Sequence, residues 1–208
     1  KSSIQSARAQ HLYNGGSLGI NIQGQLMTLG IWDGGQPQAS HENLGISRVV
    51  NKDGEFTTNS GQGGIDHATH VAGTMIGNGS VKSEARGLAF QGFLWANTWE
   101  NDIAEMTLQA GQGLLVSNHS YGARNDIYAG NNYGVFGKYT SGSRAIDVLT
   151  SNAPNYLPVI AAGNDRNTKF ENQYLNASKN GYDLLTHDAV SKNAVVVAAI
   201  DGFTSYTN

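Results

Sequence analysis

Residues 65–74 read Ile-Asp-His-Ala-Thr-His-Val-Ala-Gly-Thr, and the interpretation of the whole chain starts from this stretch. Its small residues predict a helix after a polar approach. We expect His67 at or near the helix start, where an imidazole is held rigidly yet faces a cleft. Imidazole titrates near neutral pH, so His67 is a candidate general base. Taken alone, His67 and His70 could equally be two polar helix residues without chemistry, and the neighbouring segments have to decide.

Two apolar runs of strand length end at polar residues elsewhere in the chain. Residues 26–32 stop at Asp33, and residues 159–162 lead into Gly163 and Asn164. Both runs predict buried strands, and catalytic groups collect at the carboxyl ends of strands in open α/β sheets. A carboxylate, an imidazole and an amide are the groups that acyl transfer needs as orienting acid, general base and oxyanion donor.

Four segments together resemble the motifs of the subtilisin-like serine proteases, the subtilases. Residues 30–35, Gly-Ile-Trp-Asp-Gly-Gly, are similar to the aspartate motif of that family. Residues 67–74 are similar to its His-Gly-Thr-His-Val-Ala-Gly-Thr motif, and residues 161–165 match its Ala-Ala-Gly-Asn oxyanion motif. Residues 117–122, Ser-Asn-His-Ser-Tyr-Gly, resemble the Asn-x-Ser-x-Gly strand that lines the substrate cleft. The four motifs occur in the order found in the family.

The resemblance implies a role for each polar residue in a serine endopeptidase. His67 would be the general base, Asp33 would orient and stabilise its imidazole, and Asn164 would donate to the oxyanion.

The same resemblance implies a site for the substrate, which would be a peptide or protein. Backbone groups of Ser120, Tyr121 and Gly122 would pair with an extended peptide, and Gly122 and Gly163 would let the chain pass close to it. For Ser120 a plain role as a buried strand residue remains an alternative.

The family's nucleophile has no counterpart in the sequence. It lies in a Gly-Thr-Ser-Met-Ala motif after the asparagine, and Ser205 lacks both the preceding Gly and the following small-residue helix. The chain order in subtilisin is Asp, His, Ser. We therefore interpret residues 1–208 as a single subtilase-like catalytic domain whose serine lies beyond residue 208. We expect the chain alone to be inactive, with the C-terminal remainder of the domain as its partner.

Helical and strand-like segments alternate along the chain, which predicts an α/β fold with a mostly parallel sheet. The resemblance implies a three-layer subtilisin-like fold with helices on both faces, incomplete at the C-terminus. Helices are predicted at residues 4–12, 101–113 and 141–152, strands at residues 87–95 (after a turn), 114–117 and 194–200, and a surface loop at residues 51–64.

Composition excludes several other classes. A net charge of −3 without a run of Lys or Arg argues against nucleic acid as a partner. The absence of cysteine excludes disulfides and thiolate chemistry. No stretch approaches the ~20 apolar residues of a membrane span. Resemblance to the subtilases implies a secreted or periplasmic protein, with a propeptide or inhibitor as a further partner.

No cofactor is expected from the residues. Many subtilases bind calcium in the loop that corresponds to residues 78–86, so calcium is compatible with the resemblance. Glu84 is the only acid of that loop, whereas a calcium cage needs several oxygen ligands. The sequence therefore does not support calcium binding.

Two other functional classes remain as alternatives. The first is a non-catalytic peptide-binding protein, or an inactive fragment, with a subtilase fold and no nucleophile. The second is a metal hydrolase that uses His67, His70 and either Asp66 or Asp33. Zinc-binding helices place their two histidines four residues apart with a Glu between them, whereas this chain has a spacing of three.

Overall fold

The computed structural model describes residues 2–53, 61–122, 136–170, 173–174 and 179–200. The chain forms two compact units, which are described one at a time. The first comprises residues 1–100 and 199–208, and the second comprises residues 101–198. Whether the chain is one domain stays a prediction.

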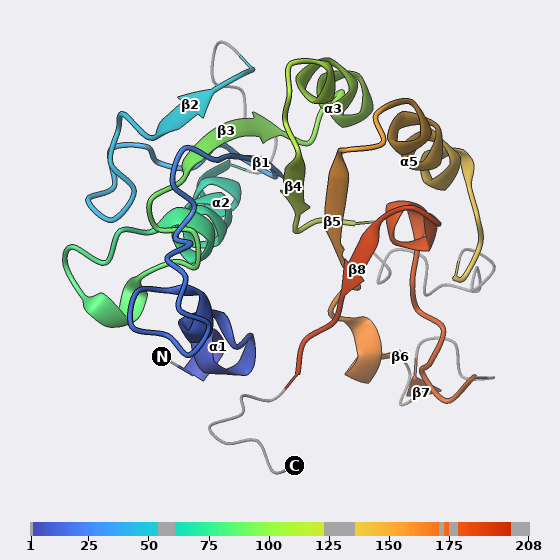
Figure 1. Ribbon diagram of the computed structural model, residues 1–208. Helices are drawn as coiled ribbons and strands as arrows, with labels where there is room; N and C mark the ends of the chain where they lie inside the picture. Colours follow the sequence, from blue (N-terminus) through green and yellow to red (C-terminus); the bar gives the residue numbers. More distant parts are fainter. Residues whose placement is uncertain (1, 54–60, 123–135, 171–172, 175–178, 201–208) are drawn as a thin grey trace. The chain divides into compact units, whose positions relative to one another are not determined.

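The first unit contains a parallel sheet of three strands. β1 (Thr28–Asp33) and β2 (Val49–Asn51) both pair with β3 (Phe93–Thr98), which lies between them. Helix α2 (Gly61–Ile76) packs against this sheet (Figure 1). Apolar side chains of the strands and the helix form the buried core, which contains Ile31, Leu44, Val49, Ala72, Ile76, Leu94 and Ala96.

Helix α2 begins earlier than the sequence indicated. Its first residue is Gly61, so the prediction of a loop through residue 64 was wrong, and His67 lies in the second turn instead of at the start. Glycines in this segment suggested a loop, but Gly64 is buried, and the helix packs very closely on the turn after β1. A Cβ atom on Gly35 would lie 2.8 Å from the backbone nitrogen of Ile65.

The N-terminal segment is not one helix. α1 (Ser2–Ser6) is followed by the 3₁₀ helix η1 (Ala9–Leu12), and Arg8 between them has a left-handed backbone with φ of 55°. That conformation ends an α-helix, so the predicted helix over residues 4–12 was wrong in its continuity. A second 3₁₀ helix, η2 (Ser83–Ala85), lies within the predicted loop at residues 78–86.

Arg48 holds together three segments of the first unit. Its Nη1 donates hydrogen bonds to the carbonyl oxygens of Ile76, Phe90 and Gly92 at 2.9, 3.0 and 3.2 Å. Burial lowers the pKa of its guanidinium.

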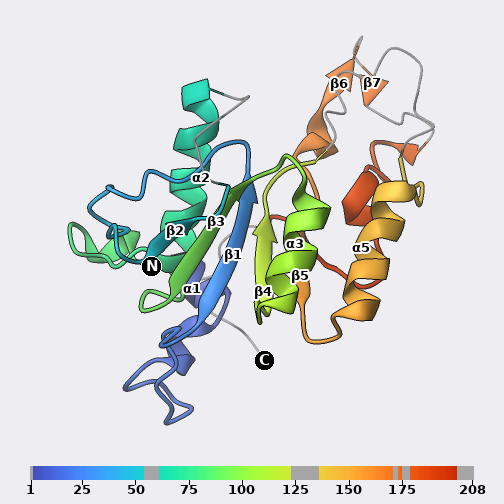
Figure 2. The same ribbon diagram turned by 90° about the horizontal axis from the view of Figure 1, so that it is seen from above.

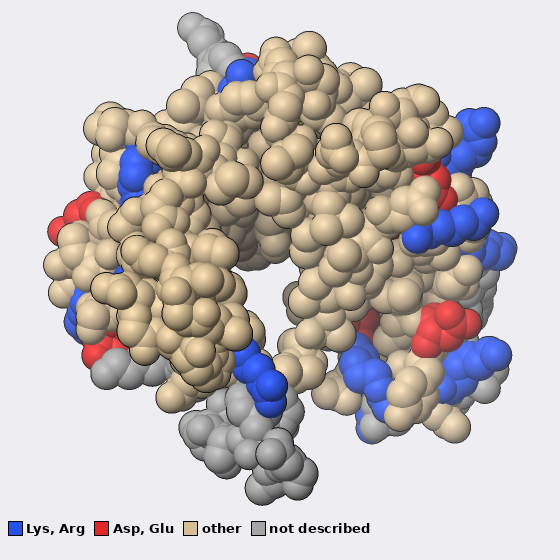
Figure 3. All heavy atoms as spheres, in the orientation of Figure 1, with Lys and Arg blue, Asp and Glu red and all other residues tan. Residues whose placement is uncertain are grey.

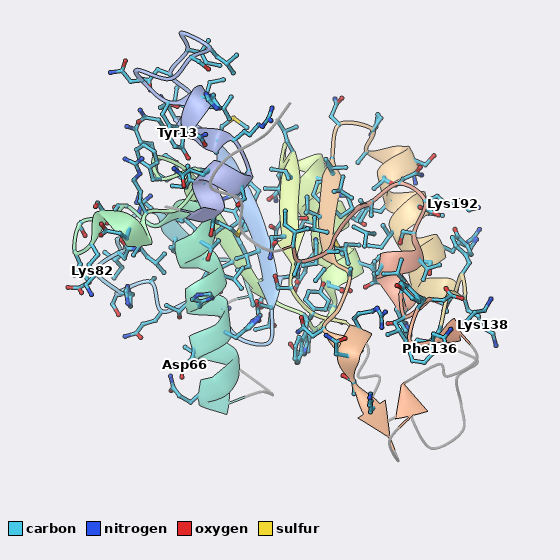
Figure 4. All side chains as sticks on the ribbon, turned by 90° about the horizontal axis from the view of Figure 1, so that it is seen from below. Tyr13, Asp66, Lys82, Phe136, Lys138 and Lys192 are labelled. Atoms are coloured by element: carbon cyan, nitrogen blue, oxygen red, sulfur yellow. The ribbon has the colours of Figure 1, made fainter. Side chains whose placement is uncertain are left out.

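We expect Arg48→Ala to lower the free energy of unfolding by about 3 kcal/mol, because buried carbonyls lose a charged donor. Urea denaturation measures this change, with exposed Lys82→Ala as the control expected to stay within about 0.5 kcal/mol of wild type (Figure 4). Equal stability of the two variants would contradict the role given to Arg48.

The second unit has its own parallel strands. β5 (Leu157–Ala161) pairs with β4 (Val116–His119) on one side and with β8 (Val195–Val197) on the other. Figure 2 shows helices α3 (Asp102–Gly111) and α5 (Ser141–Asn152) side by side next to these strands. The predicted helices at 101–113 and 141–152 are thus confirmed.

Shorter elements complete the second unit. These are the 3₁₀ helices η4 (Asp165–Asn167) and η6 (His187–Val190) and a small antiparallel pair formed by β6 (Lys169–Phe170) and β7 (Gln173–Tyr174). Strand β4 begins two residues later than predicted and extends to His119. Thr140 begins α5 with a capping box, in which its Oγ1 accepts from the backbone of Ser143.

Parallel pairing within both units confirms the predicted α/β class. The positions of Ser205 and of most of the predicted long connection at residues 122–142 lie outside the described residues. Within the described ranges, no helix is long and apolar enough to cross a membrane. Lys and Arg side chains are scattered over the face seen in Figure 3, and Asp and Glu lie among them.

Candidate active site

Asp33 is the last residue of β1 and is buried, with 2% of its surface exposed. The strand before it is held in the core, since Ile31 and Trp32 are fully buried. After the strand, the backbone N–H of Gly34 donates to Oδ1 of Asp33 at 2.7 Å. The carboxylate is therefore fixed at the carboxyl end of a buried parallel strand.

His67 meets this carboxylate from helix α2. Its Nδ1 lies 2.7 Å from Oδ1 and 2.9 Å from Oδ2 of Asp33, while half of the imidazole side chain is exposed. A carboxylate only accepts hydrogen bonds, so Nδ1 carries the proton in this arrangement. In the neutral ring Nε2 is then free of hydrogen and can accept a proton.

The environment of Asp33 acts on its charge in two directions. Burial raises the pKa of the carboxyl above its ordinary value. Hydrogen bonds from His67 and from the backbone of Gly34 oppose that rise, because they stabilise the ionised form. His67 is thus the side chain that compensates a carboxylate held away from water.

Gly163 and Asn164 belong to the second unit and directly follow β5. Gly163 has φ of 100°, a conformation that L side chains rarely adopt, so glycine is required at this turn. Asn164 follows with φ of −113°, and both residues are exposed. The amide of Asn164 therefore lies at the carboxyl end of a parallel strand, as predicted.

Ser120, Tyr121 and Gly122 continue the chain beyond β4 in the same unit. Oγ of Ser120 accepts a hydrogen bond from Nδ2 of Asn118 at 2.9 Å, and Gly122 is exposed. The hydroxyl of Tyr121 donates to Oδ2 of Asp102 at 2.8 Å. Its side chain therefore points into the unit, and only its backbone remains for pairing with a peptide.

Sequence reasoning missed His119 as a functional candidate. This residue is buried, and burial lowers its pKa to about 3. The available signal was the alternation of Ser117, His119 and Tyr121, three hydrogen-bonding side chains at every second residue. On a strand such residues share one face.

We expect His119 to make stability depend on pH. Its pKa is about 3 in the fold, against 6.5 for a free imidazole, so the unfolded chain binds more protons between these values and the free energy of unfolding falls as the pH falls. From about pH 7 to about pH 5, wild type should lose about 2 kcal/mol more than His119→Gln.

Urea denaturation of both proteins at the two pH values tests this expectation. Titration of the neighbouring groups Asp102, Tyr121, Tyr156 and Asp188 is common to both proteins and cancels to first order in the difference. Equal losses of stability in wild type and variant would show that His119 is not held neutral.

The residues of the metal-hydrolase alternative are not arranged for metal binding. Asp66 projects from α2 (Figure 4), and its Oδ1 accepts from Nε2 of Gln62 on the same helix at 2.8 Å. Asp33 is bonded to Nδ1 of His67. Across the part of the chain that the structure describes, no group of three or more His, Asp or Glu side chains could hold a metal ion.

An α/β unit in which a strand-end carboxylate binds the imidazole of a neighbouring helix defines the class of acid–base hydrolase folds. The sequence model of the subtilase family matches residues 20–208, and the chain belongs to that family. This confirms the recognition made from the four motifs.

Solved structures with the same fold are also proteases. The protease domain of PatA has a TM-score of 0.59 at 19% identity, with 86% of this chain and 60% of that one covered. The CspB protease of Clostridium perfringens has a TM-score of 0.52 at 16% identity, with coverage of 78% and 40%. For MycP1 from Mycobacterium smegmatis the values are 0.51, 18%, 88% and 50%.

The chain thus spans 40 to 60% of the length of these three structures. At such identities the likeness concerns the fold. A comparison with curated protein sequences finds no match.

Proposed function

We propose that this chain is part of a serine endopeptidase that hydrolyses peptide bonds through an Asp-His-Ser triad. The observation that carries the proposal is the hydrogen bond from Nδ1 of His67 to the buried carboxylate of Asp33. It leaves Nε2 unprotonated and accessible, as a general base requires. The serine is contributed by sequence outside these 208 residues.

The chemistry follows from these two residues. Nε2 of His67 takes the hydroxyl proton while the serine oxygen attacks the carbonyl carbon of the substrate. Asp33 stabilises the imidazolium through the proton on Nδ1. The imidazolium then gives its proton to the leaving amine. In the second half of the reaction His67 deprotonates a water molecule, which attacks the acyl-enzyme, and then returns that proton to the serine oxygen.

Asn164 supplies the third function, donation of its side-chain amide to the oxyanion of the tetrahedral intermediate. We expect Asn164→Ala to lower kcat by about 10²- to 10³-fold, which is the magnitude for the equivalent asparagine of subtilisin itself. Steady-state kinetics of the complete protein would show this, with KM nearly unchanged. Exposed Asn193→Ala is the control, and equal activity of the two variants would exclude Asn164 as the donor.

The substrate is an extended peptide that adds as a strand alongside residues 120–122. Backbone groups there pair with its amides, while Gly163 keeps the opposite wall free of a side chain. We infer that the protein is exported and that a propeptide or inhibitor occupies the same groove before activation. These assignments follow the family to which the chain belongs.

A serine-directed fluorophosphonate probe tests the proposal. We expect it to label the complete protein, or a nicked form whose second polypeptide separates on denaturation, and His67→Ala to abolish labelling. A chelator should leave activity unchanged. Peptide binding without labelling or turnover would overturn the proposal in favour of a non-catalytic peptide-binding protein. Inhibition by the chelator alone would favour the metal hydrolase.

A further inference from the structure

A row of polar side chains lies on the buried face of β4 in the second unit. Ser117, His119 and Tyr121 alternate along the strand and its extension, so they share one face. Ser117 and His119 are buried, with 1% and 3% exposed. None of the three belongs to the triad proposed above, so their chemistry calls for another explanation.

These side chains form one continuous chain of hydrogen bonds with two residues from elsewhere in the unit. Oη of Tyr156 contacts Oγ of Ser117 at 2.5 Å, and this oxygen lies 2.6 Å from Nε2 of His119. Nδ1 of His119 lies 2.9 Å from Oη of Tyr121, which is bonded to Asp102 at 2.8 Å. The chain runs from the start of β5 to the start of α3.

The direction of every bond in this chain follows from its end. The carboxylate of Asp102 can only accept, so Tyr121 uses its single hydroxyl proton there and accepts from Nδ1 of His119. Neutral His119 then accepts at Nε2 from Ser117, which in turn accepts from Tyr156. Every member of the chain has a partner, and reversing one bond leaves a buried group unsatisfied.

Asp102, where the chain ends, is itself fixed. Its Oδ1 accepts the backbone N–H of Ile103 at 2.7 Å, in the first turn of α3. The rings of His119 and Tyr121 also meet edge to face, with centroids 5.6 Å apart. The extension of β4 is therefore tied to a helix end by both hydrogen bonds and ring packing.

Residues on the other face of the strand are left for a ligand. Asn118 and Ser120 alternate with the buried row, and the hydrogen bond between them keeps both side chains on that face. Gly122, one step further, is exposed. The buried row thus constrains the very backbone, residues 120–122, that the proposed function assigns to peptide pairing.

We propose that His119 and Tyr121 are positioning residues that hold residues 120–122 in the extended conformation that receives a peptide substrate. The inference rests on the proposed function and names the device that orders its substrate-binding strand. An apolar pair would fill the same space without fixing the direction of the backbone. A satisfied polar chain accepts one arrangement, because every alternative leaves a buried donor or acceptor unpaired.

Tyr121→Phe tests this inference, because it removes only the hydroxyl that joins the chain to Asp102. Two substrates with the same leaving group are compared in the complete protein. One has a four-residue peptide that reaches along residues 120–122, and the other is a single-residue ester that does not. We expect kcat/KM for the peptide to fall ~10-fold, through KM, with the ester unchanged.

Tyr139→Phe is the matched control. Tyr139 lies in the same unit, and its hydroxyl also donates to a carboxylate, that of Asp147, at 2.7 Å. It is 43% exposed, and Nζ of Lys192 lies over its ring (Figure 4). This variant should treat both substrates as wild type does.

Each remaining outcome decides a different point. Equal losses on both substrates, or no loss on either, would overturn the positioning role and leave the protease proposal intact. Wild-type protein that hydrolyses neither substrate would overturn the proposed function and the positioning role with it. If Tyr121→Phe does not fold, Tyr156→Phe removes the first donor of the same chain and is expected to show the same selective rise in KM.

Discussion

His67→Ala is expected to lower kcat of the complete protein by about 10⁶-fold, with KM changed little. The magnitude is that known for the catalytic histidine of subtilisin, a member of the same family. The physical reason is that an unassisted serine hydroxyl is a weak nucleophile at neutral pH, and Ala offers nothing to take its proton. The imidazole acts in the transition state, so substrate binding should survive.

His70→Ala provides the matched control for that experiment. His70 lies one turn further along α2 and is also exposed, so its loss tests the effect of removing an imidazole from the same helix. Steady-state kinetics on one peptide substrate compares the two variants. Near-normal activity of His67→Ala, or an equally inactive His70→Ala, would show that the triad has been assigned wrongly.

Asp33→Asn is expected to lower kcat by about 10⁴-fold, again the magnitude seen for the triad aspartate of other serine proteases. An amide in place of the carboxylate can donate to Nδ1 of His67, which moves the ring proton to Nε2. That nitrogen then faces the serine as a donor and cannot act as a base. The 2.7 and 2.9 Å contacts of the carboxylate with Nδ1 are the bonds at stake.

Nitrogen NMR of the imidazole, together with kinetics, would test this second prediction. Wild type should carry its proton on Nδ1, and Asp33→Asn should carry it on Nε2. Asp66→Asn is the control, because Asp66 precedes His67 but bonds to Gln62 instead. An unchanged tautomer in Asp33→Asn, or full activity, would contradict the orienting role of the carboxylate.

Much of the first unit's site was predictable from the sequence. The apolar run before Asp33 predicted a buried strand with a carboxylate at its end, and the small residues after His67 predicted a helix. Both elements are present. The start of α2 was not predictable, because Gly61 and Gly64 are poor helix formers by propensity. Close packing on Gly35, a contact between distant parts of the chain, favours helix there.

The second unit was predicted less completely. Periodicity located α5 to the residue, because its apolar face is regular and Thr140 caps its start. It did not reveal that His119 and Tyr121 are joined to Asp102. Alternating Ser, His and Tyr resemble a surface strand as much as a buried one, and only the placement of α3 makes the difference. Such a network depends on tertiary contacts that no local pattern records.

The contact between Gly35 and α2 also limits how the acid and the base can move. With a hypothetical Cβ only 2.8 Å from the Ile65 nitrogen, the two backbones already touch, and repulsion between them rises steeply on further approach. Thermal motion of α2 is therefore one-sided: the helix can swing away from β1 but has no room to move closer. Fluctuations lengthen the bond between Asp33 and His67 more readily than they shorten it, so its length in the fold is close to a mechanical minimum.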